Sequence, residues 1–169
     1  MAKNTHLEHL EDDIVNQGKT GGINAIKMLR ELGSMLTEPQ SAVTITTKWD
    51  GAPAIVCGRD PETGDFFVGN KSVFNKSTPK ICYTDGFIDE YYPDSGLNKI
   101  LKDCLKYLMR LPISGVIQGD LLYEKRPPIV TMKGKRCYIF KPNTISYCVE
   151  VDSDMGRQIA KSEIGIVFH

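Results

Sequence analysis

The chain carries its only tryptophan in the run Thr46-Thr47-Lys48-Trp49-Asp50-Gly51-Ala52-Pro53-Ala54. In this run a lysine stands two residues before an aspartate and three before a glycine. Val43 and Ile45 alternate with threonines just before it, which predicts a half-buried strand that delivers Lys48. An Asp-Gly pair is also a frequent turn signal between strands, so the motif needs support from the segments that follow it.

The Lys-x-Asp-Gly spacing at residues 48–51 resembles the nucleophile motif of the covalent nucleotidyltransferases, which are the DNA ligases, RNA ligases and mRNA-capping enzymes. The resemblance implies that the amine of Lys48 attacks the α-phosphorus of a nucleoside triphosphate, forms a phosphoramidate and releases pyrophosphate. Because a free lysine has a pKa of about 10.4, the site must lower that pKa by desolvation or by a nearby cation. By the same resemblance Asp50 is a structural or ribose-proximal carboxylate, and Gly51 lets the backbone pass close to the nucleotide.

Composition places the chain among soluble globular proteins. Its 169 residues suffice for one domain with a real core, and 21 basic side chains cancel 21 acidic ones. This balance argues against a protein whose overall charge draws it strongly to nucleic acid. It is compatible with a basic patch on one face. The five cysteines fit neither a disulfide framework nor a zinc ribbon. With no signal-peptide pattern and no apolar run that could span a bilayer, we predict a cytoplasmic protein, in the host cytoplasm if viral, with no membrane partner.

Residues 1–40 are predicted to form an N-terminal helical segment. The sequence Thr5–Glu8 is a capping box that opens a first helix. A second helix is predicted from about Ile23 until Pro39 ends it. Three glycines are expected to interrupt the pattern between the two helices, at Gly18, Gly21 and Gly22.

Residues 41–169 are predicted to form the core, an α+β fold of antiparallel sheets flanked by helices. The resemblance makes this a nucleotidyltransferase domain with an ATP-grasp-like fold. Alternating and hairpin patterns predict strands at residues 54–57, 66–68, 115–123, 129–132, 137–140, 145–149 and 165–168. Amphipathic or capped segments predict helices at residues 97–108 and 155–161. The turn-rich, acidic residues 81–95 are predicted to form a surface excursion.

Asp120 stands next to a glycine within an apolar strand. Burying an unpaired carboxylate costs several kcal/mol, so Asp120 must have a partner or face a site. The superfamily has an apolar strand ending in Gly-Glu here, which supports metal or ribose binding, whereas this chain has Gly-Asp, one methylene shorter. The resemblance therefore makes Asp120 a candidate nucleotide and metal ligand, and the alternative is a strand-end aspartate capped by backbone N–H groups.

Three further segments match the superfamily in part. Lys71 and Ser72 resemble a short basic segment of the RNA ligases, which implies contact with phosphate or ribose, although a solvated loop lysine is the alternative. Phe140 fits the aromatic strand near the nucleotide base, and core aromatics have the same pattern. Glu163 stands one residue earlier than the superfamily's metal-binding carboxylate, and a one-residue shift in a strand turns a side chain to the other face.

Two departures weaken the match to typical DNA ligases. Pro53 stands where those enzymes carry arginine, which moves the chain toward RNA-ligase-like members and the ligase-like proteins of tailed bacteriophages. The chain also ends at His169, before the superfamily's Lys-x-Lys strand. We therefore expect it to be the N-terminal piece of a longer protein, with a C-terminal part missing.

The resemblance implies an ATP-dependent RNA or DNA ligase-like adenylyltransferase that acts in nucleic-acid repair. Lys48 would carry AMP, Asp120 and Glu163 would hold Mg²⁺ or Mn²⁺, and the AMP would pass to a 5′-phosphorylated nucleic-acid end. One alternative is a catalytically degenerate module of the same fold that binds a nucleotide, a nucleic acid or a protein partner. Another is capping-type transfer from GTP.

Overall fold

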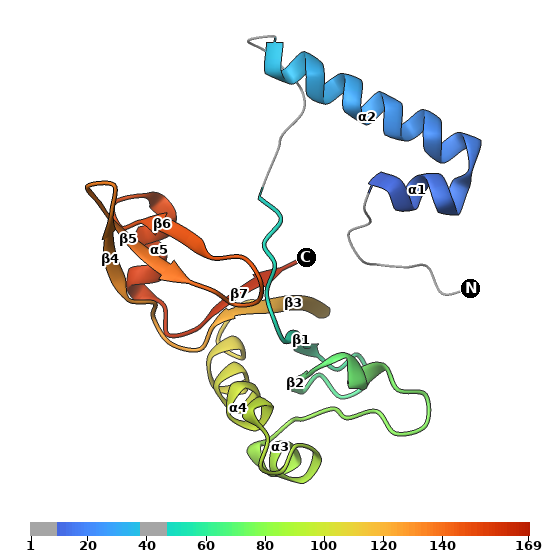
Figure 1. Cartoon of the computed structure of the whole chain (residues 1–169). Helices are drawn as coiled ribbons and strands as arrows, with labels where there is room; N and C mark the ends of the chain where they lie inside the picture. Colours follow the sequence, from blue (N-terminus) through green and yellow to red (C-terminus); the bar gives the residue numbers. More distant parts are fainter. Residues whose placement is uncertain (1–9, 38–46) are drawn as a thin grey trace. The chain divides into compact units, whose positions relative to one another are not determined.

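The computed structural model describes residues 10–37 and 47–169, and the chain divides into two compact units (Figure 1). The first unit is Met1–Lys48 and the second is Trp49–His169. This division falls after Lys48, whereas the predicted boundary lies at residue 40. The predicted α+β class with antiparallel sheets and flanking helices is confirmed. No helix within the described ranges is long and apolar enough to cross a membrane.

The described part of the first unit is a hairpin of two helices, α1 (Leu10–Gln17) and α2 (Lys19–Thr37). Gly18 joins them with φ at 56°, a left-handed conformation that suits glycine. The second helix starts at Lys19 and not near Ile23, so the prediction that Gly21 and Gly22 interrupt the helical pattern is wrong. Position 21 requires glycine because α1 passes very close: a Cβ atom there would lie 1.9 Å from the carbonyl oxygen of Asp13.

The capping box at residues 5–8, the helix stop at Pro39 and the strand predicted around Val43 and Ile45 lie outside the described residues. Residues 47–53 contain no strand or helix. The motif therefore enters the second unit as an irregular segment.

The second unit is built on a four-stranded antiparallel sheet in the order β2-β1-β3-β7. All four strands were predicted from sequence, and the β1–β2 hairpin turns at residues 60–65 as expected. Their bounds are β1 (Ala54–Arg59), β2 (Phe66–Gly69), β3 (Val116–Tyr123) and β7 (Gly165–Phe168).

The main core lies on one face of this sheet, where α4 (Gly96–Leu108) packs as predicted (Figure 1). Ile55 and Leu121 point to this face, and both are buried. Because side chains alternate along a strand, the neighbouring residue Asp120 turns to the opposite face.

Residues 81–95 do not form the predicted surface excursion. They contain α3 (Asp85–Tyr91), and Cys82, Ile88 and Tyr92 are buried in the main core. The acidic side chains occupy only the exposed side of α3. Ile88 and Tyr92, four residues apart, share the inner side, and so short a helix presents too few apolar residues for its periodicity to be recognised from sequence.

A second sheet holds the strands β4 (Ile129–Met132), β5 (Lys135–Phe140) and β6 (Tyr147–Glu150) in that order. The helix α5 (Asp154–Lys161) packs on it, and Ile159 of α5 is buried with Tyr138 and Phe140. The hydroxyl of Ser153 caps α5 by accepting a hydrogen bond of 3.0 Å from the Gly156 N–H. The predicted hairpin, strand and capped helix are confirmed.

The five cysteines predict a simple thiol titration. Four are buried and Cys148 is exposed. Burial raises the pKa of the Cys57 and Cys82 thiols to about 11 and that of Cys104 to about 12. Because the thiolate is the reactive form, we expect one thiol per chain to react rapidly with an aromatic disulfide reagent at pH 8, and the other four to react only after unfolding. Two or more fast thiols in the folded protein would contradict the burial described above.

Candidate functional site

Residues 51–53, at the end of the Lys-x-Asp-Gly motif and just after it, pack directly on β3 beside Asp120. A Cβ atom on Gly51 would lie 2.6 Å from the carbonyl oxygen of Leu121 and 2.7 Å from Cβ of Asp120. The Ala52 N–H donates to the Leu121 carbonyl at 3.0 Å, and the Leu121 N–H donates to the Pro53 carbonyl at 3.0 Å. The structure therefore brings Gly51 of the first motif against Asp120 of the second.

Asp50 is held by residues from the second sheet. Its backbone N–H donates to the Tyr147 hydroxyl at 2.6 Å, and its carboxylate accepts a hydrogen bond of 3.0 Å from the Asn143 side-chain amide. Tyr147 and Asn143 lie 97 and 93 positions from Asp50 in the sequence. Sequence reasoning missed both, because a strand tyrosine and a turn asparagine carry no local signal of such a contact. These bonds favour the structural role of Asp50 over the ribose-proximal one.

Asp120 is half-buried on the sheet face opposite α4. Its neighbours across the sheet are Ala54 on β1 and Val167 on β7. Within residues 10–37 and 47–169 no side chain or backbone N–H forms a hydrogen bond or ion pair with its carboxylate. The backbone cap required by the structural alternative is therefore not formed there, and the carboxylate is available to a ligand.

Lys71 and Ser72 lie close to the motif across the sheet. They begin the short 3₁₀ helix η1 (Lys71–Phe74), which follows β2. An open hollow of about 510 Å³ is lined by Lys71, Ser72, Asn70, Asn75, Pro53 and Ala54. The Ser72 N–H donates to Asn70 Oδ1 at 2.9 Å, and its hydroxyl lies 2.7 Å from that of Tyr92. Because Ala54 is the cross-strand neighbour of Asp120, this hollow adjoins the Asp120 position.

Phe140 belongs to an aromatic cluster around Trp49. The Trp49 and Phe140 rings are nearly parallel, at 9°, with centroids 6.1 Å apart, and the Tyr147 ring lies 4.6 Å from Trp49. Tyr123 meets Phe140 edge-on at 5.2 Å. Trp49 thus connects the motif segment to the second sheet, a role that the sequence did not predict.

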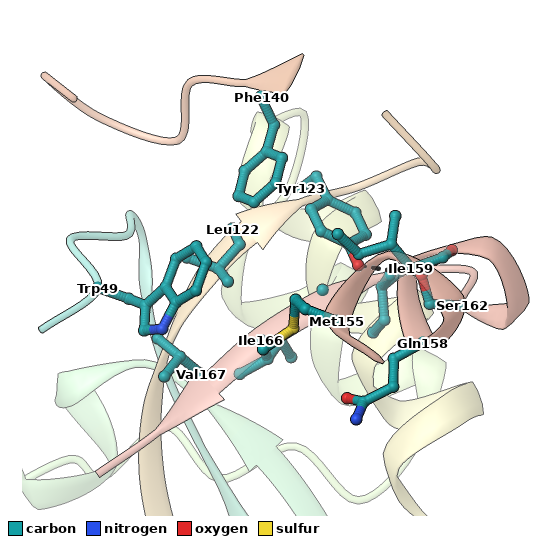
Figure 2. Close-up of a pocket in the computed structure, with 12 residues that line it drawn as sticks. Trp49, Leu122, Tyr123, Phe140, Met155, Gln158, Ile159, Ser162, Ile166 and Val167 are labelled. Atoms are coloured by element: carbon teal, nitrogen blue, oxygen red, sulfur yellow. Dashed lines mark hydrogen bonds between the residues drawn. The ribbon is translucent and has the colours of Figure 1, made fainter. Parts of the chain in front are cut away.

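The cluster forms one wall of a pocket of about 290 Å³ (Figure 2). Figure 2 shows the Met155 side chain reaching toward the pocket from α5, and the hydrogen bond between the Tyr123 and Ser162 hydroxyls, 3.0 Å long, at one side. Besides these residues, the lining consists of Trp49, Phe140, Leu122, Gln158, Ile159, Ile164, Gly165, Ile166 and Val167. A mainly apolar pocket of this size suits one flat ring system better than a whole nucleotide.

Glu163 is exposed and does not join Asp120. Val167 pairs with Asp120. Glu163 stands four residues before Val167 and two before the start of β7, so it lies outside the strand that carries Val167. In the described parts of the chain, no three His, Cys, Asp or Glu residues are placed to hold a metal ion. Asp120 is therefore the better-placed of the two predicted metal ligands.

Lys48 is exposed and is the last residue of the first unit, directly before Trp49. The strand that was predicted to deliver it lies in residues outside the described ranges. Its covalent link to Trp49 ties it to the segment that packs on β3.

Comparison with known proteins gives one match. A family model described as a family of unknown function (DUF6267) matches residues 4–169. No curated protein and no solved structure matches the chain.

Proposed function

This chain belongs to the DUF6267 family, and from its own residues we propose that it is an ATP-dependent, RNA- or DNA-ligase-like adenylyltransferase. The observation that carries the proposal is the packing of Gly51 on Asp120 and Leu121. This contact joins the Lys-x-Asp-Gly motif to a half-buried carboxylate with no partner in the described residues. A structural turn needs no such carboxylate beside it, whereas a nucleotide and metal site does.

The proposed reaction begins with Lys48. Its neutral amine attacks the α-phosphorus of ATP: the Nζ–P bond forms, the bond from that phosphorus to the bridging oxygen breaks, and pyrophosphate leaves with the electron pair. The proton of the amine passes to solvent. Lys48 is exposed, so a bound triphosphate–metal complex would have to displace water from the amine and place a cation near it before the neutral amine could attack.

The remaining predicted residues have positions that suit a nucleotide near the motif. Lys48 is three residues from Gly51, and three residues of chain span at most about 11 Å. Lys71 and Ser72 would bind phosphate from the hollow beside Ala54, and the pocket walled by Phe140 would take the base.

The carboxylate of Asp120 is a suitable oxygen ligand for a divalent cation. Mg²⁺ is usually held by one or two carboxylates together with substrate phosphates, and Asp120 offers one carboxylate with no protein partner in the described residues. Mg²⁺ or Mn²⁺ bound there would neutralise charge on the phosphates. Glu163 is exposed and is not placed beside Asp120, so it would not bind the same ion.

Covalent labelling tests the proposal. We expect the protein, incubated with Mg²⁺ and ATP labelled at the α-phosphate, to retain label after denaturation in detergent. A phosphoramidate survives alkali and is lost in acid, which separates it from a phosphate ester. Labelling from GTP in place of ATP would instead indicate capping-type chemistry, and labelling from neither would contradict nucleotidyl transfer.

A second candidate is a binding module of the same fold without chemistry. The exposed Lys48, the lone carboxylate Asp120 and the position of Glu163 away from it favour this candidate. Because Trp49 is the only tryptophan and lines the pocket, its fluorescence provides a binding assay. ATP that changes this fluorescence but leaves no covalent label would support the module.

A further inference from the structure

A second feature of the chain is a strongly basic hairpin far along the sequence from the motif. Residues 125–136, called the basic hairpin below, carry five Lys or Arg side chains and no Asp or Glu. The chain as a whole is neutral, with 21 side chains of each sign, so the rest of it is net acidic. Positive charge is therefore concentrated just before β4, in the turn after β4 and at the start of β5.

The turn of the basic hairpin has a lysine where the backbone favours other residues. Lys133 and Gly134 form the two-residue connection between β4 and β5, with φ at 49° and 79°. Such a turn has φ above zero at both positions and strongly prefers Asn, Asp or Gly at the first. A lysine at this position weakens the turn, so local folding does not explain its presence. The exposed positive charge of Lys133 is the property that explains a lysine at this position.

The cations are spread along a line and do not form a single cluster. Every β4 side chain is exposed, and β4 is the edge strand of its sheet. Arg126 and Lys133 flank β4 and are both exposed; seven residues separate them, which is roughly 20 Å of extended chain. Lys135 is already paired with Glu150 at 2.5 Å. Cations that have no partner in the described residues and are spread over this length suit an extended polyanion better than a single anion.

The basic hairpin is joined rigidly to the candidate site. β5 starts at Lys135 beside the turn and ends at Phe140 on the wall of the pocket, which is about 17 Å along the strand. Tyr138 and Phe140 are buried, which fixes this strand. A nucleic-acid strand in a duplex rises about 3.4 Å per nucleotide, so a strand that starts near the pocket would reach the turn after about five nucleotides.

We propose that the basic hairpin binds the sugar–phosphate backbone of the nucleic acid whose end receives the adenylyl group. The proposal rests on the proposed function for the choice of a nucleic acid over an acidic protein. It adds a surface, chiefly Arg126, Lys133 and Arg136, that contributes affinity without reading sequence. This surface also reconciles a neutral chain with a polyanionic partner.

Binding of 5′-phosphorylated, fluorescein-labelled single strands of 4 and 16 nucleotides tests the proposal, measured by fluorescence anisotropy between 50 and 200 mM salt. The test variant is Arg126→Ala/Lys133→Asn, and the matched control is Lys106→Ala/Arg110→Ala, which removes two exposed cations at the end of α4. Loss of two phosphate contacts should weaken binding of the long strand about 25-fold at 0.1 M salt and reduce the salt slope by about 1.4. The short strand and the control should change less than about twofold.

Asparagine is chosen at position 133 because it suits the left-handed turn. We expect the melting temperature of Lys133→Asn to equal or exceed that of the unaltered chain while its affinity falls, a combination that a purely structural role cannot produce. The proposal is overturned if the test variant binds the long strand as tightly as the control does. It is also overturned if polyglutamate of equal charge displaces the strand as well as unlabelled nucleic acid does.

Failure of the proposed function would look different. The test variant should still accept label from ATP at the rate of the unaltered chain, because neither Arg126 nor Lys133 lines the candidate site. If the unaltered chain takes no label but binds the long strand through the basic hairpin, the adenylyltransferase proposal fails and the surface stands. If label forms and the test and control variants bind the long strand equally well, the basic-hairpin proposal is refuted and the adenylyltransferase proposal stands.

Discussion

Lys48→Arg is expected to abolish covalent labelling by ATP, with a fall in rate of at least about 1,000-fold, while nucleotide binding persists. Arginine keeps the positive charge, but its guanidinium does not deprotonate in proteins. It therefore cannot supply the neutral nitrogen that attacks the α-phosphorus. A 1,000-fold loss corresponds to about 4 kcal/mol of the activation barrier, as expected for removal of the nucleophile itself.

Lys71→Arg is the matched control for this substitution. A guanidinium beside Ser72 still contacts phosphate, so we expect its labelling rate to fall less than about tenfold. Rates come from the alkali-stable label, and ATP binding comes from the change in Trp49 fluorescence. The adenylylated peptide should contain Lys48. Label that persists in Lys48→Arg, or that maps to another lysine, would refute the assignment of the nucleophile.

Gly51→Ala is expected to destabilise the protein by about 3 kcal/mol, near the upper end of the range for overpacking. The added Cβ would lie 2.6 Å from the Leu121 carbonyl oxygen and 2.7 Å from Cβ of Asp120. Relief by movement is costly, because β3 is hydrogen-bonded to β1 on one side and to β7 on the other. Since the same shift would displace Asp120 from the motif, labelling by ATP should fall with stability.

Gly96→Ala provides the control within the same unit. Gly96 is the first residue of α4, and nothing lies within 4 Å of the position that an alanine methyl would occupy there, apart from its own helix and chain neighbours. Alanine at this position should change stability by no more than about 0.5 kcal/mol, in the stabilising direction. Urea unfolding followed by circular dichroism measures both variants. Equal midpoints for Gly51→Ala and the unaltered chain would show that the motif does not pack on β3.

Several elements follow from local patterns alone. Short apolar runs predicted β1 and β3, and the spacing of apolar residues along α4 predicted its buried side. Ser153 before a short helix predicted the cap that is observed. The same kind of reasoning was wrong at α3, where the many acidic residues obscure the pattern of the two buried side chains, Ile88 and Tyr92. It was also wrong at Gly21, where glycine is required by the close approach of α1 and does not mark a break in the helix.

By itself, the sequence determined the strands of the second unit and most of the helices, with α3 and the start of α2 as exceptions. It also marked Lys48, Gly51 and Asp120 as residues worth testing, because those signals lie within a few neighbouring positions. Only the tertiary structure decided that Gly51 rests on Asp120 and that Tyr147 anchors Asp50 from 97 positions away. Such contacts depend on sheet register and on the packing of one sheet against another. Those are properties of the folded backbone, and no local periodicity encodes them.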